Sequence, residues 1–253
     1  MEFVAEVGVN HLGSEEKAIS YCTKLAATEV DAVTLQIREE SFYDESTSWK
    51  KSLHKDCYIS CGEIIKSSGK LFGLAISDLA VAKSYINLAP DFWKVLSWGI
   101  KDLSLIEFLI ATHIPVHIST GISDMAEIKS IADICDRRVG FIHTQLSSDI
   151  EDVNLSAIAS MRSATGCDVS FGLHCENFDV INVAIPFAPC SIFFYVKEKP
   201  DFFYPDGSYA ILLSDIDVMI NSARQLAHSV GDGIKHKFVP KTLSDSDKPK
   251  SLR

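Results

Sequence analysis

The sequence lacks any apolar run close to the roughly 20 residues that a membrane-spanning helix needs. Its first residues, MEFVAEVG, lack the basic start and the long apolar stretch of a secretory signal peptide. Basic residues are outnumbered, since 24 Lys and Arg stand against 34 Asp and Glu, for a formal net charge of −10. This balance argues against sequence-independent binding to nucleic acid or acidic membranes, which requires clustered Lys and Arg. We therefore expect a cytoplasmic protein with no nucleic-acid and no membrane partner.

The sequence also lacks the cysteine pattern of a disulfide framework, because its seven cysteines are odd in number and scattered through apolar segments. Without an export signal they are expected to be reduced thiols. What is present is ordinary for a globular protein: 253 residues, of which 47% are hydrophobic and 23% are charged. That length is enough to bury one large core.

Apolar, β-rich runs alternate with helical patterns along almost the whole chain. The expected strands are residues 2–10, 30–37, 70–77, 91–97, 115–120, 138–145, 167–173 and 190–196. Amphipathic segments, several of which open with an N-capping residue, cover residues 14–29, 77–88, 102–113, 124–136, 154–165 and 214–230. Near-continuous apolar strands indicate parallel strands buried under outer helices. The pattern predicts an α/β fold, a single eight-stranded parallel (β/α)8 TIM barrel over residues 1–235, followed by a polar basic tail or linker stub at 236–253.

In such a barrel the chemistry lies at the carboxyl ends of the strands. Polar side chains follow the expected strands here, and they include Asn10, His11, Gln36, Arg38, Ser97, Ser119, Thr120, His143, His174, Cys175 and Glu176. Strand ends also meet water, so any one of them could be polar for that reason alone. The long segment 38–56 is expected to lie over the barrel mouth. The aromatic-rich segment 193–206 is either a lid over that mouth or an exposed interaction surface.

Residues 6–14, EVGVNHLGS, place a carboxylate, an amide and an imidazole where the first strand meets the first helix. Apolar alternation does not explain them. The segment resembles the E-I-G-x-N-H-x-G opening of the sialic acid (N-acetylneuraminate) synthase family. Further segments resemble motifs of that family in the same order, namely DAVTLQ from Asp31, WKVLS from Trp93, PVHISTGISDMAEI from Pro115, EDVNLSAI from Glu151 and YPDGSYAILLSDI from Tyr204.

The resemblance implies a barrel enzyme that condenses phosphoenolpyruvate with an amino sugar, using a divalent cation such as Mn²⁺ or Mg²⁺. It implies that Glu6 lies near the reacting carbons and that Asn10 and His11 shape the catalytic site. Phosphate or carboxylate oxygens would be bound by Lys94, Ser97 and Ser119, because such oxygens attract an ammonium group and hydroxyl donors. Gln36, Thr120 and His143 complete the predicted substrate contacts. The family's carboxy-terminal antifreeze-like domain, which reaches into the partner's active site, is expected to be absent.

Several positions depart from the family pattern where that pattern carries chemistry. Thr34 stands in place of a lysine, and His174 and Cys175 stand in place of a serine and an aspartate after strand seven. The two metal-binding histidines of the family correspond to Glu176 and Val196. A carboxylate can bind Mn²⁺ or Mg²⁺, so Glu176, with His174 beside it, is the predicted metal site.

Three interpretations remain open. The chain is a divergent sugar-acid synthase or related lyase that acts on a small phosphorylated or sugar substrate. Alternatively, a rebuilt ligand or metal site uses His174, Cys175 and Glu176 beside His143 and His11. In the third interpretation the barrel is catalytically degenerate and serves as a ligand-binding or partner subunit. A homodimer or a complex with another protein is expected in any of these cases.

Overall fold

The computed structural model describes residues 1–135 and 138–235, so the predicted tail at 236–253 lies outside the described residues. Eight parallel strands follow one another in chain order, and β8 pairs with β1 to close the ring. The strands are β1 (Glu2–Gly8), β2 (Ala32–Gln36), β3 (Leu71–Ile76), β4 (Phe92–Val95), β5 (Val116–Ser119), β6 (Val139–His143), β7 (Val169–Leu173) and β8 (Ser191–Lys197). A short ninth strand, β9 (Ile211–Leu212), extends the sheet beside β8. The predicted (β/α)8 barrel is confirmed.

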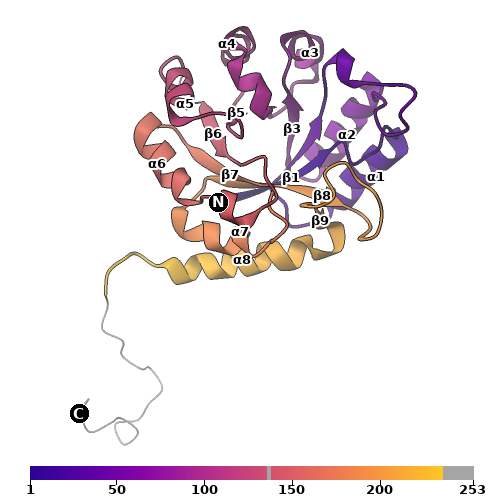
Figure 1. The fold of residues 1–253 in the computed structure, drawn as a ribbon. Helices are drawn as coiled ribbons and strands as arrows, with labels where there is room; N and C mark the ends of the chain where they lie inside the picture. The colour runs from indigo at the N-terminus through magenta and orange to yellow at the C-terminus, as the bar shows by residue number, and fades with distance from the viewer. Residues whose placement is uncertain (136–137, 236–253) are drawn as a thin grey trace, which may run out of the picture.

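Helices surround the strands on the outside (Figure 1). They are α1 (Glu15–Ala26), α2 (Lys55–Ser67), α3 (Leu79–Tyr85), α4 (Leu103–Ala111), α5 (Met125–Ala132), α6 (Ser156–Thr165), α7 (Val180–Ala184) and α8 (Ile216–Val230). The expected N-caps are confirmed for four of them, where a side-chain oxygen of Ser14, Asp78, Asp102 or Asp124 accepts a backbone N–H of the first turn. Helices α2 and α7 are additions to the predicted set.

Side chains inside the barrel form an apolar layer below a polar one. The apolar layer consists of Val4, Ala32, Phe92, Ile142 and Phe193. Gly73 leaves the room that this layer needs, because a Cβ there would lie 2.4 Å from the ring of Phe92. Two residues further along their strands, Glu6 and Lys94 are also buried. The polar layer therefore lies toward the carboxyl ends of the strands, where the sequence predicts the site.

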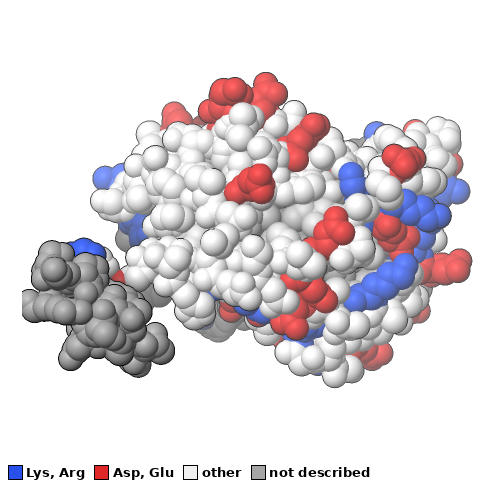
Figure 2. All heavy atoms as spheres, turned by 90° about the horizontal axis from the view of Figure 1, so that it is seen from below, with Lys and Arg blue, Asp and Glu red and all other residues white. Residues whose placement is uncertain are grey.

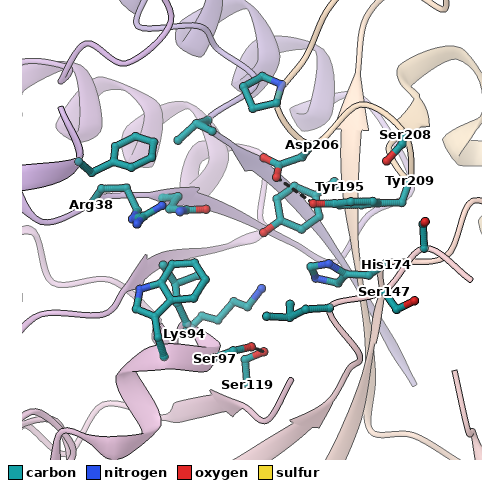
Figure 3. Close-up of a pocket in the computed structure, with 18 of the residues that line it drawn as sticks. Arg38, Lys94, Ser97, Ser119, Ser147, His174, Tyr195, Asp206, Ser208 and Tyr209 are labelled. Carbon is teal, nitrogen blue, oxygen red and sulfur yellow. Dashed lines mark hydrogen bonds between the residues drawn. The ribbon is translucent and has the colours of Figure 1, made fainter. Parts of the chain in front are cut away.

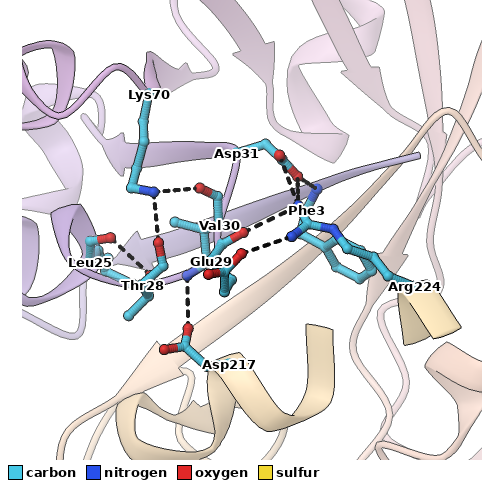
Figure 4. Close-up of polar contacts among 9 residues, drawn as sticks. All are labelled: Phe3, Leu25, Thr28, Glu29, Val30, Asp31, Lys70, Asp217 and Arg224. Carbon is cyan, nitrogen blue, oxygen red and sulfur yellow. Dashed lines mark hydrogen bonds and ion pairs between the residues drawn. The ribbon is translucent and has the colours of Figure 1, made fainter. Parts of the chain in front are cut away.

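The amino-terminal ends of β1 and β2 are tied to α8 by a polar network (Figure 4). Arg224 of α8 bonds the Asp31 carboxylate at 3.0 Å and the Glu29 carboxylate at 3.1 Å. The same Asp31 carboxylate accepts the backbone N–H of Phe3 at 2.7 Å. These contacts are partly exposed, so each stabilises the fold by about 1 kcal/mol or less. Their role is to hold this end of the barrel to its last helix.

The face that contains α8 carries few charges. Figure 2 shows it largely covered by uncharged side chains, with acidic groups in separate places. Val218, Leu226 and Val230 of α8 are exposed. Among the described residues, no helix combines the length and the apolar character needed to cross a bilayer.

Candidate active site

A cavity of about 470 Å³ opens at the carboxyl ends of the strands. The predicted residues that line it are Gln36, Lys94, Ser97, Ser119 and His174. Residues from four mouth loops contribute to the wall, namely Arg38, Phe42, Trp49, Trp98, Leu146, Ser147, Ser148, Pro205, Asp206, Ser208 and Tyr209. Figure 3 shows Lys94, Ser97 and Ser119 on one side of this space and Tyr195, Asp206 and Tyr209 on the other. The cavity therefore brings together five of the predicted residues with others that the sequence did not indicate.

The floor of the cavity holds a buried ion pair. The Lys94 ammonium of β4 contacts the Glu6 carboxylate of β1, and both side chains are less than 5% exposed. The ammonium also lies 5.5 Å from the ring centre of Phe193 and 5.7 Å from that of Tyr195. Because β1 and β4 are separated by two strands, the pair spans the barrel interior. Glu6 thus compensates the charge of the one lysine that lines the cavity.

Two hydroxyl groups lie together where β4 and β5 end. The Oγ atoms of Ser97 and Ser119 are 2.9 Å apart, and both residues are buried. The Ser97 Oγ also accepts the backbone N–H of Gly121 at 3.2 Å. Hydroxyl and backbone donors at one strand edge are suited to anionic oxygens, and Lys94 lines the same cavity.

The loop between β8 and β9 closes another side of the cavity. Asn10 holds it: the Asn10 amide donates to the Val196 carbonyl at 2.9 Å, and its oxygen accepts the Asp206 N–H at 3.1 Å. The Tyr209 hydroxyl donates to the Asp206 carboxylate at 3.0 Å (Figure 3). Burial raises the pKa of Asp206 to about 6, although the Tyr209 hydrogen bond acts in the opposite direction. This carboxyl group can therefore hold or release a proton near neutral pH.

His174 is packed among aromatic rings inside the cavity. Its imidazole stacks on Tyr209 with ring centres 4.7 Å apart and meets Tyr195 edge-on at 5.6 Å. Burial, aided by the nearby Lys94 charge, lowers the pKa of His174 to about 3. The imidazole is consequently neutral at physiological pH and can accept or donate one hydrogen bond.

Six predicted residues are not among those that line the cavity, namely Glu6 and Asn10, whose contacts are given above, and His11, Thr120, His143 and Glu176. The Nδ1 atom of His11 accepts the Gly13 N–H at 3.1 Å, and burial lowers its pKa to about 4. The Thr120 hydroxyl donates to the Ile142 carbonyl at 2.9 Å. His143 lies on the outer side of β6, where its Nε2 is 2.8 Å from the Val153 carbonyl oxygen. These three have contacts that organise loops, and their positions do not match a direct substrate contact.

The predicted metal ligands are not brought together. Glu176 is exposed outside the cavity wall, whereas His174 lies inside it. Cys175 and Val196 both point into the outer hydrophobic core. On β8 the residue that faces the cavity is Tyr195, next to Val196. In residues 1–135 and 138–235, no group of three His, Cys, Asp or Glu side chains fits a metal ion.

The segment after β2 lies over the mouth, as predicted. Phe42 and Trp49 from this segment line the cavity. Their rings are 6.0 Å apart, and Trp49 is 6.3 Å from Phe203 of the loop after β8. The two mouth loops therefore touch through aromatic rings. Of the aromatic segment 193–206, Tyr195, Pro205 and Asp206 line the cavity, while Phe203 is 63% exposed.

A model of the NeuB family matches residues 22–235. The chain belongs to the NeuB family. Among curated relatives, this NeuB chain is 24% identical to the pseudaminic acid synthase of Helicobacter pylori, over 96% of this chain and 78% of the relative. It is 23% identical to a pseudaminic acid synthase of Campylobacter jejuni, over 91% of this chain and 75% of that protein. The family assignment agrees with the resemblance found in the sequence.

Solved structures place the NeuB chain in the same fold. The N-acetylneuraminic acid (sialic acid) synthetase of Leptospira borgpetersenii superposes with a TM-score of 0.83 at 18% identity, covering 95% of this chain and 87% of that one. The spore coat polysaccharide biosynthesis protein spsE of Bacillus subtilis gives 0.81 at 19% identity, covering 98% and 74%. At this identity the likeness concerns the fold alone.

Sequence reasoning missed much of the cavity wall, including Tyr195, Asp206 and Tyr209. Alternation along β8 is the signal for Tyr195, since Phe193 lies inside the barrel and the side chain two residues on must face the same way. Asp206 and Tyr209 lie in the turn YPDGSYA, which resembles a family motif but carries no sign of facing the cavity. Contacts of Asn10 and Lys197 hold that turn over the site.

Proposed function

We propose that this NeuB-family chain condenses phosphoenolpyruvate with an amino sugar to form a sugar acid. The observation that carries the proposal is that Lys94, paired with the buried Glu6, lines the same cavity as the hydroxyl pair of Ser97 and Ser119. An ammonium group and hydroxyl donors suit a substrate that carries both a phosphate and a carboxylate. The synthases among its relatives supply the reaction class.

Seven side chains at the site have a role in this proposal. Lys94, Ser97 and Ser119 bind the anionic oxygens of phosphoenolpyruvate. Glu6 offsets the positive charge of Lys94 and holds its ammonium group in position. The methylene carbon of phosphoenolpyruvate bonds to the aldehyde carbon, whose oxygen takes a proton, and water replaces phosphate at the enol carbon. Asp206, with a pKa of about 6, is the group suited to exchange that proton. Gln36 and the neutral His174 offer hydrogen bonds to the sugar.

The test is phosphate release from phosphoenolpyruvate in the presence of N-acetylmannosamine and related amino sugars. We expect release that depends on a sugar and that falls at least 100-fold in Glu6→Gln and Lys94→Met. Lys129→Met, an exposed position on α5, is the control and should keep full activity. Unchanged turnover in Glu6→Gln would refute the assignment of this residue.

Phosphate release together with a binding measurement distinguishes an active synthase from a catalytically degenerate barrel. Such a barrel would bind phosphoenolpyruvate in a calorimetric titration but release no phosphate with any amino sugar.

The exposed Phe202 and Phe203 at the mouth support a protein partner in either case, either a second copy or another chain. Sedimentation of the wild type and of Phe203→Ser tests this. A cytoplasmic location, where phosphoenolpyruvate is made, belongs to the same proposal.

A further inference from the structure

Two basic side chains line the cavity at different depths. Lys94 is 4% exposed and is part of the floor with Glu6. Arg38 is 15% exposed and lies next to Trp98, which is 43% exposed at the mouth. Figure 3 shows Arg38 on the side of the cavity opposite His174. The mechanism proposed above uses Lys94 and leaves Arg38 without a role.

The guanidinium of Arg38 is held in place without any ligand. Its Cζ lies 4.0 Å from the ring centre of Phe42 and 4.7 Å from that of Trp98. Its Nε and Nη2 donate to the Glu39 carboxylate at 3.0 and 2.7 Å. The Ser77 hydroxyl fixes that carboxylate in turn, at 3.2 Å. A guanidinium that is already oriented loses little entropy when it binds an anion.

One edge of the guanidinium remains available. Within residues 1–135 and 138–235, all hydrogen bonds of its nitrogens go to Glu39, and Nη1 makes none. Its two aromatic neighbours, Phe42 and Trp98, both line the cavity. An arginine with unused donors beside a cavity is suited to the planar pairs of oxygens in a carboxylate or phosphate.

We infer that Arg38 binds an anionic group, phosphate or carboxylate, on the sugar that joins phosphoenolpyruvate. The acceptor is thus an acidic amino sugar rather than a neutral one. This rests on the proposed function, in which phosphoenolpyruvate occupies the deep site of Lys94, Ser97 and Ser119. The second substrate then lies nearer the mouth, at the depth of Arg38. The Glu39 carboxylate competes with the ligand for the Arg38 guanidinium. Replacing Glu39 should therefore strengthen the binding of an anionic sugar.

The experiment compares three probes by calorimetric titration: N-acetylmannosamine, its 6-phosphate and the corresponding uronic acid. We expect the wild type to bind one or both anionic sugars about 10- to 100-fold more tightly than the neutral sugar, as one charge-assisted contact allows. Arg38→Met, which keeps an apolar stem against the aromatic rings, should abolish this preference. Glu39→Gln should strengthen it, and Lys129→Met should leave it unchanged. The phosphate and uronate arms show which anion is recognised.

Several outcomes would overturn the inference. If Arg38 only anchors the mouth loop through Glu39, Arg38→Met and Glu39→Gln change binding in the same direction. If Arg38 belongs to the phosphoenolpyruvate site, Arg38→Met weakens that ligand and leaves the sugar preference intact. Binding of none of the sugars, or equal binding of all three, also overturns it. Phosphate release is measured separately, so retained preference without turnover refutes the proposed function alone.

Discussion

The side-chain oxygen of Asn10, just beyond β1, accepts a hydrogen bond from the backbone N–H of Asp206 at 3.1 Å, across 196 residues of sequence. The same side chain donates to the carbonyl of Val196 at the end of β8. One amide therefore joins the first strand end, the last strand end and the loop that carries a cavity carboxylate. This relationship accounts for an asparagine at a position that apolar alternation does not explain.

Replacing Asn10 should destabilise the fold and loosen this loop. Asn10→Ala removes a buried donor and a buried acceptor, and we expect a loss of about 1–3 kcal/mol in the free energy of unfolding. Urea denaturation of Asn10→Ala measures it, with Asn221→Ala, an exposed position on α8, as the control. A loss no larger than that of the control would mean that the two hydrogen bonds contribute little.

The Glu6–Lys94 pair should show strong energetic coupling. Either Glu6→Gln or Lys94→Met leaves a buried charge without its partner, which costs about 3–5 kcal/mol. The double variant buries no unpaired charge, so its loss should be clearly smaller than the sum of the two single losses. A double-mutant cycle from urea unfolding provides the measurement. Additive losses would contradict the coupling.

Asp206 should make stability fall as the pH rises. Its carboxyl pKa is raised from 3.8 to about 6 in the folded protein, so between pH 4 and pH 6 the folded state binds more protons than the unfolded state. Its contribution is favourable below about pH 4 and is lost as the pH rises through 6. Between pH 4 and pH 6, wild-type stability relative to Asp206→Asn should decrease by about 2 kcal/mol.

The comparison with Asp206→Asn is needed because buried histidines act in the opposite direction. The pKa values of His11 and His174 are lowered to about 4 and about 3, so their stabilising effect is complete above pH 6.5 and is lost as the pH falls. Unfolding curves at several pH values isolate the carboxyl group. Asp201→Asn, exposed in the same loop, is the control. A difference that does not change with pH would rule out the raised pKa.

Gly8 should tolerate no side chain. Its φ is +56°, and a Cβ would lie 2.6 Å from the Tyr195 ring and 2.8 Å from the Asp206 carboxylate. Gly166 has a φ of +68° but open space around it. Gly166→Ala should therefore cost only the conformational penalty of about 1 kcal/mol, whereas Gly8→Ala should cost more and also impair ligand binding. Thermal unfolding of both variants makes the comparison, and equal losses would exclude the predicted clash.

The fold follows from local patterns in the sequence. Eight buried apolar runs, six of them followed by a recognised helix pattern, are sufficient to predict a parallel barrel. Residues on the strands were also predictable, because alternation with a period of two assigns them to a face. Gln36, Lys94 and Ser119, which strand ends and the family resemblance indicate, do line the cavity.

Loop geometry, by contrast, was decided by tertiary contacts. His143 and Glu176 follow or end strands just as Lys94 and Ser119 do, yet one lies outside the barrel and the other is exposed. Strand order alone does not say on which side a strand's last residues point. Asp206 and Tyr209 reach the cavity because side chains of other segments hold their loop, among them Asn10 through the Asp206 N–H and Lys197 through the Gly207 carbonyl. The sequence by itself determined a NeuB barrel and the strand residues that line part of its cavity. The tertiary structure decided the rest of its wall, because such long-range hydrogen bonds leave no local pattern.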